Sequence, residues 1–135
     1  MTNILKEKKF QCRVSSIANL EIGLCGRAGM FDGQPDTCWR SDQGSPQWIY
    51  IIFEEPTTVS GFSMQFQGGF VGQECVVELL IEGLGIMSEP FYPEDNNLLQ
   101  NFTLSQPQEV KYVRFVFGKS TDFYGRLIIY ELLIR

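Results

Sequence analysis

Histidine is absent from this chain of 135 residues. Imidazole is the side chain that most often acts as a general base at neutral pH, and it is a common zinc ligand. Its absence excludes Ser-His-Asp and Cys-His catalysis and most zinc sites. Carboxylate pairs remain as acid–base groups, but no pair stands in a catalytic arrangement. The sequence therefore predicts a protein that is not an enzyme.

Long apolar runs are missing as well. A membrane-spanning helix needs about 20 consecutive apolar residues, and no segment is long enough. The first residues, Met1 to Lys6, lead into charged residues and not into the apolar stretch of a signal peptide. None of the four cysteines stands in a CxxC pair, and nothing else points to secretion. We therefore expect free thiols and a protein of the nucleus and cytoplasm.

Basic residues are the minority among the charged ones. The chain holds 11 Lys and Arg against 16 Asp and Glu, which gives a net charge of −5. This balance argues against nucleic acid and anionic membranes as partners. The basic cluster Lys6–Lys9 falls in residues 1–11, which we expect to be a flexible, solvated N-terminus. The length fits a single domain, residues 1–135, with one core, and we expect a monomer.

What the chain has in abundance is β-branched and aromatic residues in short runs. Gln47–Phe53 is such a run between two prolines, which predicts a strand buried on both faces. Gly61–Gln67 alternates strictly, so its apolar side chains should face the core: Phe62, Met64 and Phe66. Further strands are expected over 75–82, 99–104, 110–117 and 126–134. Short strands separated by turn residues predict an all-β sandwich.

Both tryptophans stand in or beside the turn-rich segment Phe31–Trp48. Asp32-Gly33 and Gln34-Pro35-Asp36 have the composition of turns. A large aromatic side chain directly after a loop usually anchors that loop to the core. We therefore predict that Trp39 and Trp48 are both buried and close the same end of the sandwich.

Several blocks of this sequence resemble a discoidin domain, the factor V/VIII C-type fold. Phe31–Trp39 ("FDGQPDTCW") and Gln47–Phe66 ("QWIYIIFEEPTTVSGFSMQF") are similar to its first half, and Val110–Phe117 and Gly125–Ile134 to its closing strands. The similarity runs from about Cys12 onward. It implies a jelly-roll β-sandwich of the galactose-binding-domain type, with ligand sites on the loops of one end.

A narrower resemblance rests on four blocks in order: 37–48 ("TCWRSDQGSPQW"), 65–70 ("QFQGGF"), 91–102 ("FYPEDNNLLQNF") and 121–130 ("TDFYGRLIIY"). They are similar to a small intracellular family of nuclear-receptor-associated proteins. Its members are single discoidin domains that bind and repress an orphan (testicular) nuclear receptor. The resemblance implies an adaptor or corepressor that binds a nuclear receptor and modulates transcription. Secreted discoidin domains close with a cysteine pair near the termini, whereas this chain has no cysteine after Cys75.

Two loops carry candidate residues for binding a partner. Arg40, Asp42 and Gln43 bring a planar donor, a carboxylate and an amide to one loop, which suits a sugar or a peptide. The same groups can equally satisfy the backbone of their own loop. Phe70 and Val71 stand between glycines, which predicts an exposed apolar loop tip of the kind that marks a contact surface. The alternative is that Phe70 packs onto the sandwich.

A structural calcium ion is the cofactor that the resemblance suggests. Sugar-binding discoidin relatives hold Ca²⁺ with a Glu of the last strand and with the Asp and Thr of the Asp-Gly turn. The matching residues here are Asp32, Thr37 and Glu131, with Asp36 nearby, and oxygen ligands suit Ca²⁺. Alternation along the last strand places Glu131 on the core face, where an unpaired carboxylate is costly. Gln34 stands where these relatives have Asp or Asn, and Glu131 has the alternatives of pairing with an arginine or capping loop amides.

Two further turns have simpler interpretations. Phe91–Asn97 is an acidic turn whose charge could complement a basic partner. Before the last strand, we expect Asp122 and Arg126 to form an ion pair that fixes the turn.

Two other functions use the same fold. A carbohydrate-binding module would use the same loops and the calcium site, although nothing in the sequence points to secretion. A ubiquitin-ligase substrate receptor of the Doc type shares the fold, but it usually carries a C-terminal docking tail, whereas this chain ends at Arg135 in the predicted last strand. A non-catalytic protein-binding module is the interpretation that we carry to the structure.

Overall fold

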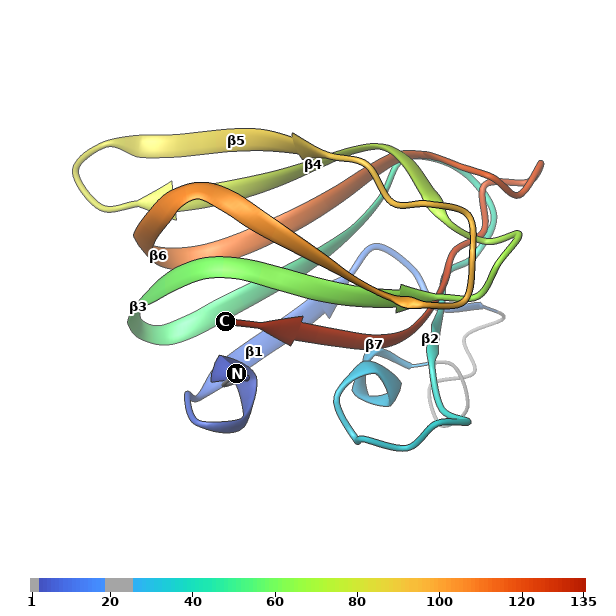
Figure 1. The fold of residues 1–135 in the computed structure, drawn as a ribbon, viewed down its shortest axis with the longest axis horizontal. Coiled ribbons are helices and arrows are strands. Elements are labelled where there is room, and N and C mark those ends of the chain that lie inside the picture. Colours follow the sequence, from blue (N-terminus) through green and yellow to red (C-terminus); the bar gives the residue numbers. More distant parts are fainter. Residues whose placement is uncertain (1–2, 19–25) are drawn as a thin grey trace.

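The structure, a computed structural model, describes residues 3–18 and 26–135. These residues form a jelly-roll β-sandwich, as the sequence predicts (Figure 1). Its strands are β1 (Phe10–Val14), β2 (Trp39–Arg40), β3 (Gln47–Phe66), β4 (Gly72–Ile81), β5 (Gly85–Phe91), β6 (Leu99–Ser120) and β7 (Ile128–Ile134). Two 3-10 turns accompany them, η1 (Ile4–Lys6) and η3 (Arg27–Met30). No helix in the described ranges is long and apolar enough to cross a membrane.

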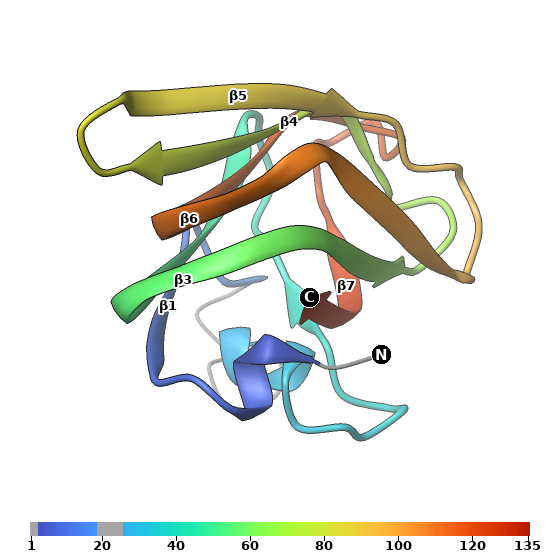
Figure 2. The same cartoon turned by 60° about the vertical axis from the view of Figure 1, so that its left-hand side comes forward.

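The two layers share the long strands β3 and β6. Each of these strands bends sharply in its middle and returns in the other layer (Figures 1 and 2). In the first arm of β3, residues 49–53 pair with β1 and residues 47–52 with 112–117 of β6. In the second arm, residues 62–66 pair with β7 and residues 61–65 with 99–103 of β6. One layer is therefore β1-β3-β6-β4-β5 and the other is β2-β7-β3-β6.

The bends explain a difference from the predicted strands. Gln47–Phe53 and Gly61–Gln67 were expected to be separate, but they are the two arms of β3, and 99–104 and 110–117 are the two arms of β6. Register shifts in the β3–β6 ladder mark the corner, between Ile52 and Thr57 and again between Val59 and Gly61. Such irregularities let a strand pass from one layer to the other and accommodate a residue without an N–H, here Pro56.

Aromatic rings fill the space between the layers. The ring of Phe62 packs against those of Phe91, Phe102 and Phe115, with centroids 5.0, 5.1 and 4.8 Å away. Burying aromatic side chains contributes a large share of the stability of such a core. The prediction that Phe62, Met64 and Phe66 face inward is confirmed, since all three are buried.

The two tryptophans lie in different environments. Trp39 is fully buried, and its indole N–H donates to the carbonyl of Ser16 at 2.9 Å. Trp48 is only half-buried, because it projects from the outer face of β3 beside Tyr50, with ring centroids 5.5 Å apart. The predictions that β3 is buried on both faces and that Trp48 closes the core are therefore wrong. Only the alternate positions, such as Ile49, enter the core.

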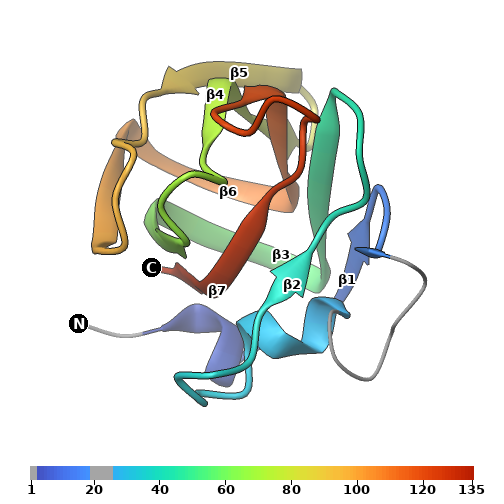
Figure 3. The ribbon, with the colours of Figure 1, turned by 90° about the vertical axis from the view of Figure 1, so that its right-hand side faces the viewer.

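The N-terminal residues are part of the fold. Leu5 is buried, and the side chain of Asn3 accepts hydrogen bonds from the backbone N–H groups of Leu5 and Ile134. η1 contacts β7, beside which it lies in Figure 3. Residues 3–11 are thus docked on the sandwich and end in strand β1, which differs from the expected flexible N-terminus. Lys6–Lys9 are exposed, as predicted, and so is Gln11.

Candidate functional site

Three loops meet at one end of the sandwich, which we call the loop end: residues 41–46, 67–71 and 121–127 (right side of Figure 1). Backbone hydrogen bonds join them directly. The N–H of Gly44 donates to Tyr124 at 2.8 Å, that of Thr121 to Val71 at 2.9 Å, and that of Ser41 to Leu127 at 2.9 Å. These bonds fix the loops relative to one another.

Glycine is required where two of these loops touch. Gly125 has a φ of 82°, in the left-handed region that favours glycine. A Cβ at this position would lie 2.7 Å from the carbonyl oxygen of Gly44. The close approach of loops 41–46 and 121–127 therefore depends on Gly125.

The predicted ligand residues gather around one cleft of this end. Arg40, Asp42, Gln43 and Phe70 all line a cleft with a volume of about 320 Å³, which we call the loop-end cleft. The remaining described lining residues are Ala18, Ser41, Gln67, Arg126, Leu127 and Ile128. Two loops that are distant in the sequence thus contribute to a single surface.

Val71 does not belong to this surface. It is fully buried in the core, and its N–H donates to the hydroxyl of Thr121 at 3.0 Å. The predicted exposed tip is therefore wrong for Val71, because β4 begins at Gly72 and the chain has already turned inward.

Phe70 is half-buried, between the two states that the sequence left open. The guanidinium carbon of Arg126 lies 5.3 Å from the centroid of its ring. The exposed aromatic tip of the loop end is instead Phe123, whose exposed fraction is 93%, followed by Tyr124 at 56%. Sequence reasoning missed both, although two aromatics next to a glycine in a turn segment were the signal for an exposed tip.

Arg126 is the fixed positive charge of the cleft. Its Nε and Nη2 atoms donate to the carboxylate of Asp122 at 2.9 and 3.0 Å, which confirms the predicted ion pair. These bonds hold the pKa of the Asp122 carboxyl below its usual range and raise the pKa of Arg126. The guanidinium also lies near the rings of Phe70 and Tyr124, so ion pairing and cation–π contacts both hold it in place.

Buried polar side chains support the floor of the cleft. The Ser41 hydroxyl accepts a bond from the N–H of Leu127 at 2.8 Å and donates to the carbonyl of Asp42 at 3.0 Å. The Gln47 amide donates to the carbonyls of Asp42 and Gly44 at 3.2 and 2.9 Å. Asp42 and Gln43 are exposed above these groups, so a rigid floor presents polar side chains to solvent.

Loop polar groups also serve their own backbone, the alternative that the sequence left open. The carboxylate of Asp42 accepts a bond from the backbone N–H of Gln43 at 2.8 Å. The backbone N–H of Asp42 donates to the hydroxyl of Ser16 at 2.9 Å. One oxygen of Asp42 is thus engaged within the loop, and the exposed carboxylate retains acceptor capacity for a ligand.

Two of the four candidate calcium ligands bond to each other. The Asp32 carboxylate accepts bonds from the Thr37 hydroxyl at 2.6 Å and from the N–H of Gln34 at 2.9 Å, and these bonds lower its pKa. Asp36 is exposed in the same turn. Within residues 3–18 and 26–135, no three Asp, Glu, Cys or His side chains lie close enough together to hold a metal ion. Calcium binding by Asp32, Asp36, Thr37 and Glu131 stays a prediction.

Glu131 is not on the core face that alternation predicts. The β3–β7 ladder pairs Gln65 with Glu131 but Phe66 with Ile129, so Tyr130 is an extra residue in the register. This bulge reverses the alternation. Beyond the bulge Leu132 and Ile134 are buried, and Glu131 is only half-buried.

The thiols of Cys12, Cys38 and Cys75 are free. Cys25, the fourth cysteine of the sequence, lies outside the described residues.

Comparison with known proteins agrees with this geometry. The F5/8 type C domain family matches residues 14–132. The chain belongs to this family. Among its relatives are proteins named nuclear receptor 2C2-associated protein: 43% identical over 123 residues in Danio rerio (90% of this chain, 87% of the relative), 45% over 121 residues in Xenopus tropicalis (89% and 88%), and 38% over 136 residues in Homo sapiens (99% and 96%). The narrower resemblance of the four sequence blocks is thereby confirmed.

Solved structures confirm the F5/8 type C fold. Chitosan-binding module 1 from a Paenibacillus chitosanase/glucanase has a TM-score of 0.77 at 22% identity and covers 100% of this chain and 99% of its own. The family 32 carbohydrate-binding module of Clostridium perfringens NanJ, solved with galactose, has a TM-score of 0.76 at 17% identity, with 93% and 92% covered. At these identities the likeness concerns the fold alone.

Proposed function

We propose that this F5/8 type C domain is a non-catalytic adaptor that binds a nuclear receptor through its loop-end cleft and represses its transcriptional activity. The observation that carries the proposal is the convergence of Arg40, Asp42, Gln43 and Phe70 on one cleft. Relatives that share 38–45% of their residues with this chain are named for association with nuclear receptor 2C2. A receptor of that kind is the partner that we propose.

The chemistry of the cleft suits a protein partner. Arginine and aromatic side chains are enriched at the energetic centres of protein interfaces, and the cleft offers Arg126 and Phe70 with Tyr124 alongside. Asp42 adds an acceptor and Gln43 an amide at its rim. Because the loops are braced by backbone bonds, docking requires little rearrangement, which lowers the entropic cost of association.

The direct test is isothermal titration of the purified chain with purified nuclear receptor 2C2. We expect saturable binding that is weakened at least about tenfold by Phe70→Ser and by Arg40→Ala, the loss typical of an interface hot spot. Leu84→Ser is the matched control, because Leu84 is 74% exposed in the β4–β5 turn at the opposite end. Melting curves of each variant verify that the fold is retained.

Four outcomes would count against the proposal. Absence of receptor binding would remove the partner, and equal affinity of Phe70→Ser and wild type would remove Phe70 from the site. Saturable binding of galactose or chitosan oligosaccharides, lost in Arg40→Ala, would instead support the carbohydrate-binding alternative. Retention of ubiquitin-ligase subunits in a pull-down would favour the Doc-type alternative.

Repression, localisation and assembly have separate tests. In the proposed role the chain is a monomer that acts in the nucleus and cytoplasm. Light scattering should give the mass of one chain, and a tagged chain should be visible in both compartments. A receptor-driven reporter should fall on expression of wild type and stay unchanged with Phe70→Ser.

A further inference from the structure

Strand β1 has one edge that no described strand pairs with. Its ladder partner is β3, and the bonds from Ser15 N–H to the Trp48 carbonyl and from Glu54 N–H to the Lys9 carbonyl, both 3.0 Å, set the phase of the pairing. Bonded residues alternate along an antiparallel ladder, so residues 9, 11, 13 and 15 bond to β3. The backbone groups of Phe10, Cys12 and Val14 point the other way, and no described residue bonds to them.

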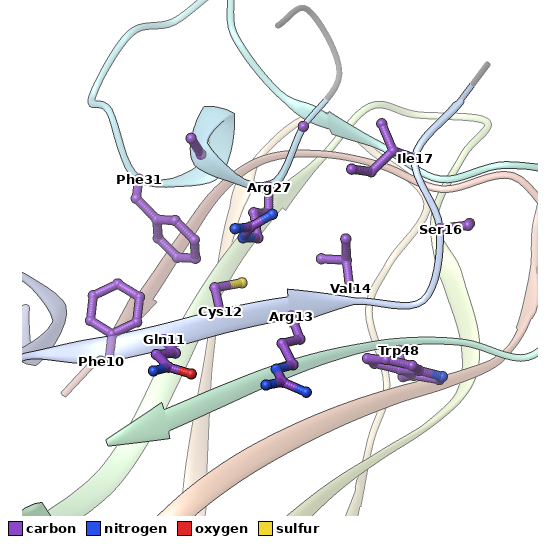
Figure 4. A pocket seen from close by; sticks show the side chains of 12 residues that line it. Phe10, Gln11, Cys12, Arg13, Val14, Ser16, Ile17, Arg27, Phe31 and Trp48 are labelled. Atoms are coloured by element: carbon purple, nitrogen blue, oxygen red, sulfur yellow. The ribbon is translucent and has the colours of Figure 1, made fainter. Parts of the chain in front are cut away.

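A cleft runs along this edge. It has a volume of about 980 Å³, and we call it the edge cleft. Figure 4 shows β1 crossing it, with η3 on one side of the strand and Trp48 on the other. The edge Phe10–Val14 has five residues, which at about 3.4 Å per residue corresponds to a docking length of about 17 Å. That is the length of an ordinary β-strand segment.

The charge of the edge cleft is opposite to that of the chain. Arg13 and Arg27 line it, and no Asp or Glu occurs among its described lining residues, although the chain has a net charge of −5. Neither arginine forms a salt bridge with a described residue. In Figure 4 they lie on opposite sides of β1, Arg13 on the strand itself and Arg27 on η3.

The pKa of the Cys12 thiol, which lies between the two arginines, reflects the positive charge of the cleft. Burial raises the pKa of Cys12 to about 12, and the positive charge of Arg27 opposes this rise. Arg27 is therefore near enough to the middle of the β1 edge to act on a group there.

Apolar surfaces flank both arginines. The rings of Phe10 and Phe31 meet edge to face at one end of the cleft, with centroids 5.4 Å apart. Val14, Ile17 and Trp48 lie toward the other end. Apolar side chains on either side of a central acidic pair would therefore find contacts.

We propose that the edge cleft binds an extended acidic segment of a partner protein, which adds to β1 as an extra strand. Its backbone bonds to the free groups of Phe10, Cys12 and Val14. Because successive side chains of a strand point to opposite faces, two adjacent acidic residues reach both arginines, one Arg13 and the other Arg27.

A second copy of the chain fits this edge less well. The segment Phe10–Val14 contains no carboxylate, so pairing of β1 with β1 of another copy would leave the arginines of both copies without acidic partners. The charge of the cleft thus selects an acidic segment from a different protein.

The test is fluorescence polarisation with labelled, acetylated heptapeptides made of valine and threonine. Each peptide carries two adjacent glutamates, and the position of this glutamate pair differs from one peptide to the next. We expect saturable binding of at least one peptide. Arg13→Gln and Arg27→Gln should each weaken it about fivefold, the effect of losing a favourable ion pair at a partly exposed site. Lys119→Gln, which removes an exposed lysine on β6 remote from β1, is the matched control and should leave the affinity unchanged.

Backbone pairing has its own probe. Methylating alternate backbone nitrogens of the binding peptide removes the strand bonds and keeps the charge, so it should abolish binding. Unchanged affinity of the methylated peptide would overturn strand addition. So would equal binding of a peptide with two lysines, or absence of binding by every peptide at about 1 mM.

The edge cleft is independent of the loop-end proposal. Phe70→Ser should leave peptide affinity unchanged, so failure at one surface is distinguishable from failure at the other. Concentration-dependent dimerisation that Arg13→Glu strengthens would identify a second copy as the occupant and overturn the proposal.

Discussion

At the loop end, Arg126 is matched within the chain, whereas at the β1 edge no described residue bonds to the outer backbone groups or forms an ion pair with the arginines. Arg126 has a bidentate carboxylate partner and two aromatic neighbours, while Arg13 has no ion pair with any described residue. The first arrangement fixes side chains in place and favours recognition of one shape. The second offers a strand template and a charge, which tolerate many sequences. One small domain thus combines a selective surface with a permissive one.

Gln47 connects these two regions. Its side-chain oxygen accepts bonds from the hydroxyls of Ser15 and Ser16, which follow β1, and its amide donates to Asp42 and Gly44 in the loop end. Ser16 lines the edge cleft and Asp42 the loop-end cleft. The two regions differ in their surfaces, but the buried amide of Gln47 bonds to both of them.

The largest expected effect separates the two tryptophans. Trp39→Ala should lower the free energy of unfolding by about 3–5 kcal/mol, because it empties a fully buried site and removes the bond to Ser16. Trp48→Ala should cost less than about 2 kcal/mol, since the ring is half exposed. Urea titration of both variants gives the values, and equal losses would contradict the assignment of Trp48 to the outer face.

Replacing the shared amide should disturb both regions at once. Gln47→Met keeps the volume but leaves the Ser15 and Ser16 hydroxyls and the Asp42 and Gly44 carbonyls without this partner, which should cost about 2–3 kcal/mol. Urea titration measures the loss. Receptor and peptide titrations should both weaken, and loss at only one surface would show that the clefts are uncoupled.

A substitution confined to the loop end should sharpen the contrast. Gly125→Ala places a Cβ about 2.7 Å from the Gly44 carbonyl at a positive φ, so we expect a loss of about 1–3 kcal/mol and displaced loops. Chemical-shift changes should be confined to loops 41–46 and 121–127. Peptide affinity at β1 should be unchanged, and a peptide-binding defect would refute the separation of the two surfaces.

The smallest effect is the pH response of the Asp122–Arg126 pair. Because its folded-state pKa is lowered from 3.8, the Asp122 carboxylate stabilises the fold above that pH, and this contribution is lost as the pH falls through the lowered value. Asp122→Asn should cost about 0.5–1 kcal/mol at pH 7 and close to nothing in strong acid. Arg13→Gln, which removes no ion pair, is the control and should leave melting unchanged at both pH values. A pH-independent difference would contradict the ion pair.

The sequence predicted the layered fold because its signals are local. The alternating run around Phe62 and the apolar run around Phe115 each define which face enters the core, and both are buried. The turn at Asp122–Arg126 was also readable, since both partners lie within four residues. The family blocks added the grouping of strands that periodicity alone does not give.

The remaining features depend on pairing between distant segments. The bulge that turns Glu131 away from the core arises in the register of β7 against Phe66, which no local pattern encodes. Likewise, whether Trp48 is covered depends on what packs on the outer face of its layer. Strands β1 and β5 were missed because their runs contain polar residues, proline or glycine. These runs are strands because they pair with β3 and β4.

The sharp bends of β3 and β6 have a consequence for local opening. Hydrogen-bonded pairing continues at the corner, where Thr57, Thr58 and Val59 pair with Val110, Glu109 and Gln108. The layers are thus joined by hydrogen-bonded backbone at this corner, which we call the spine, and by loops at the other end. Amide protons at the spine should exchange only through global unfolding, whereas those of the loop end exchange through smaller openings. We therefore expect the corner to be the last part of the sandwich to open, while the braced loops limit the receptor-binding end to small, local openings.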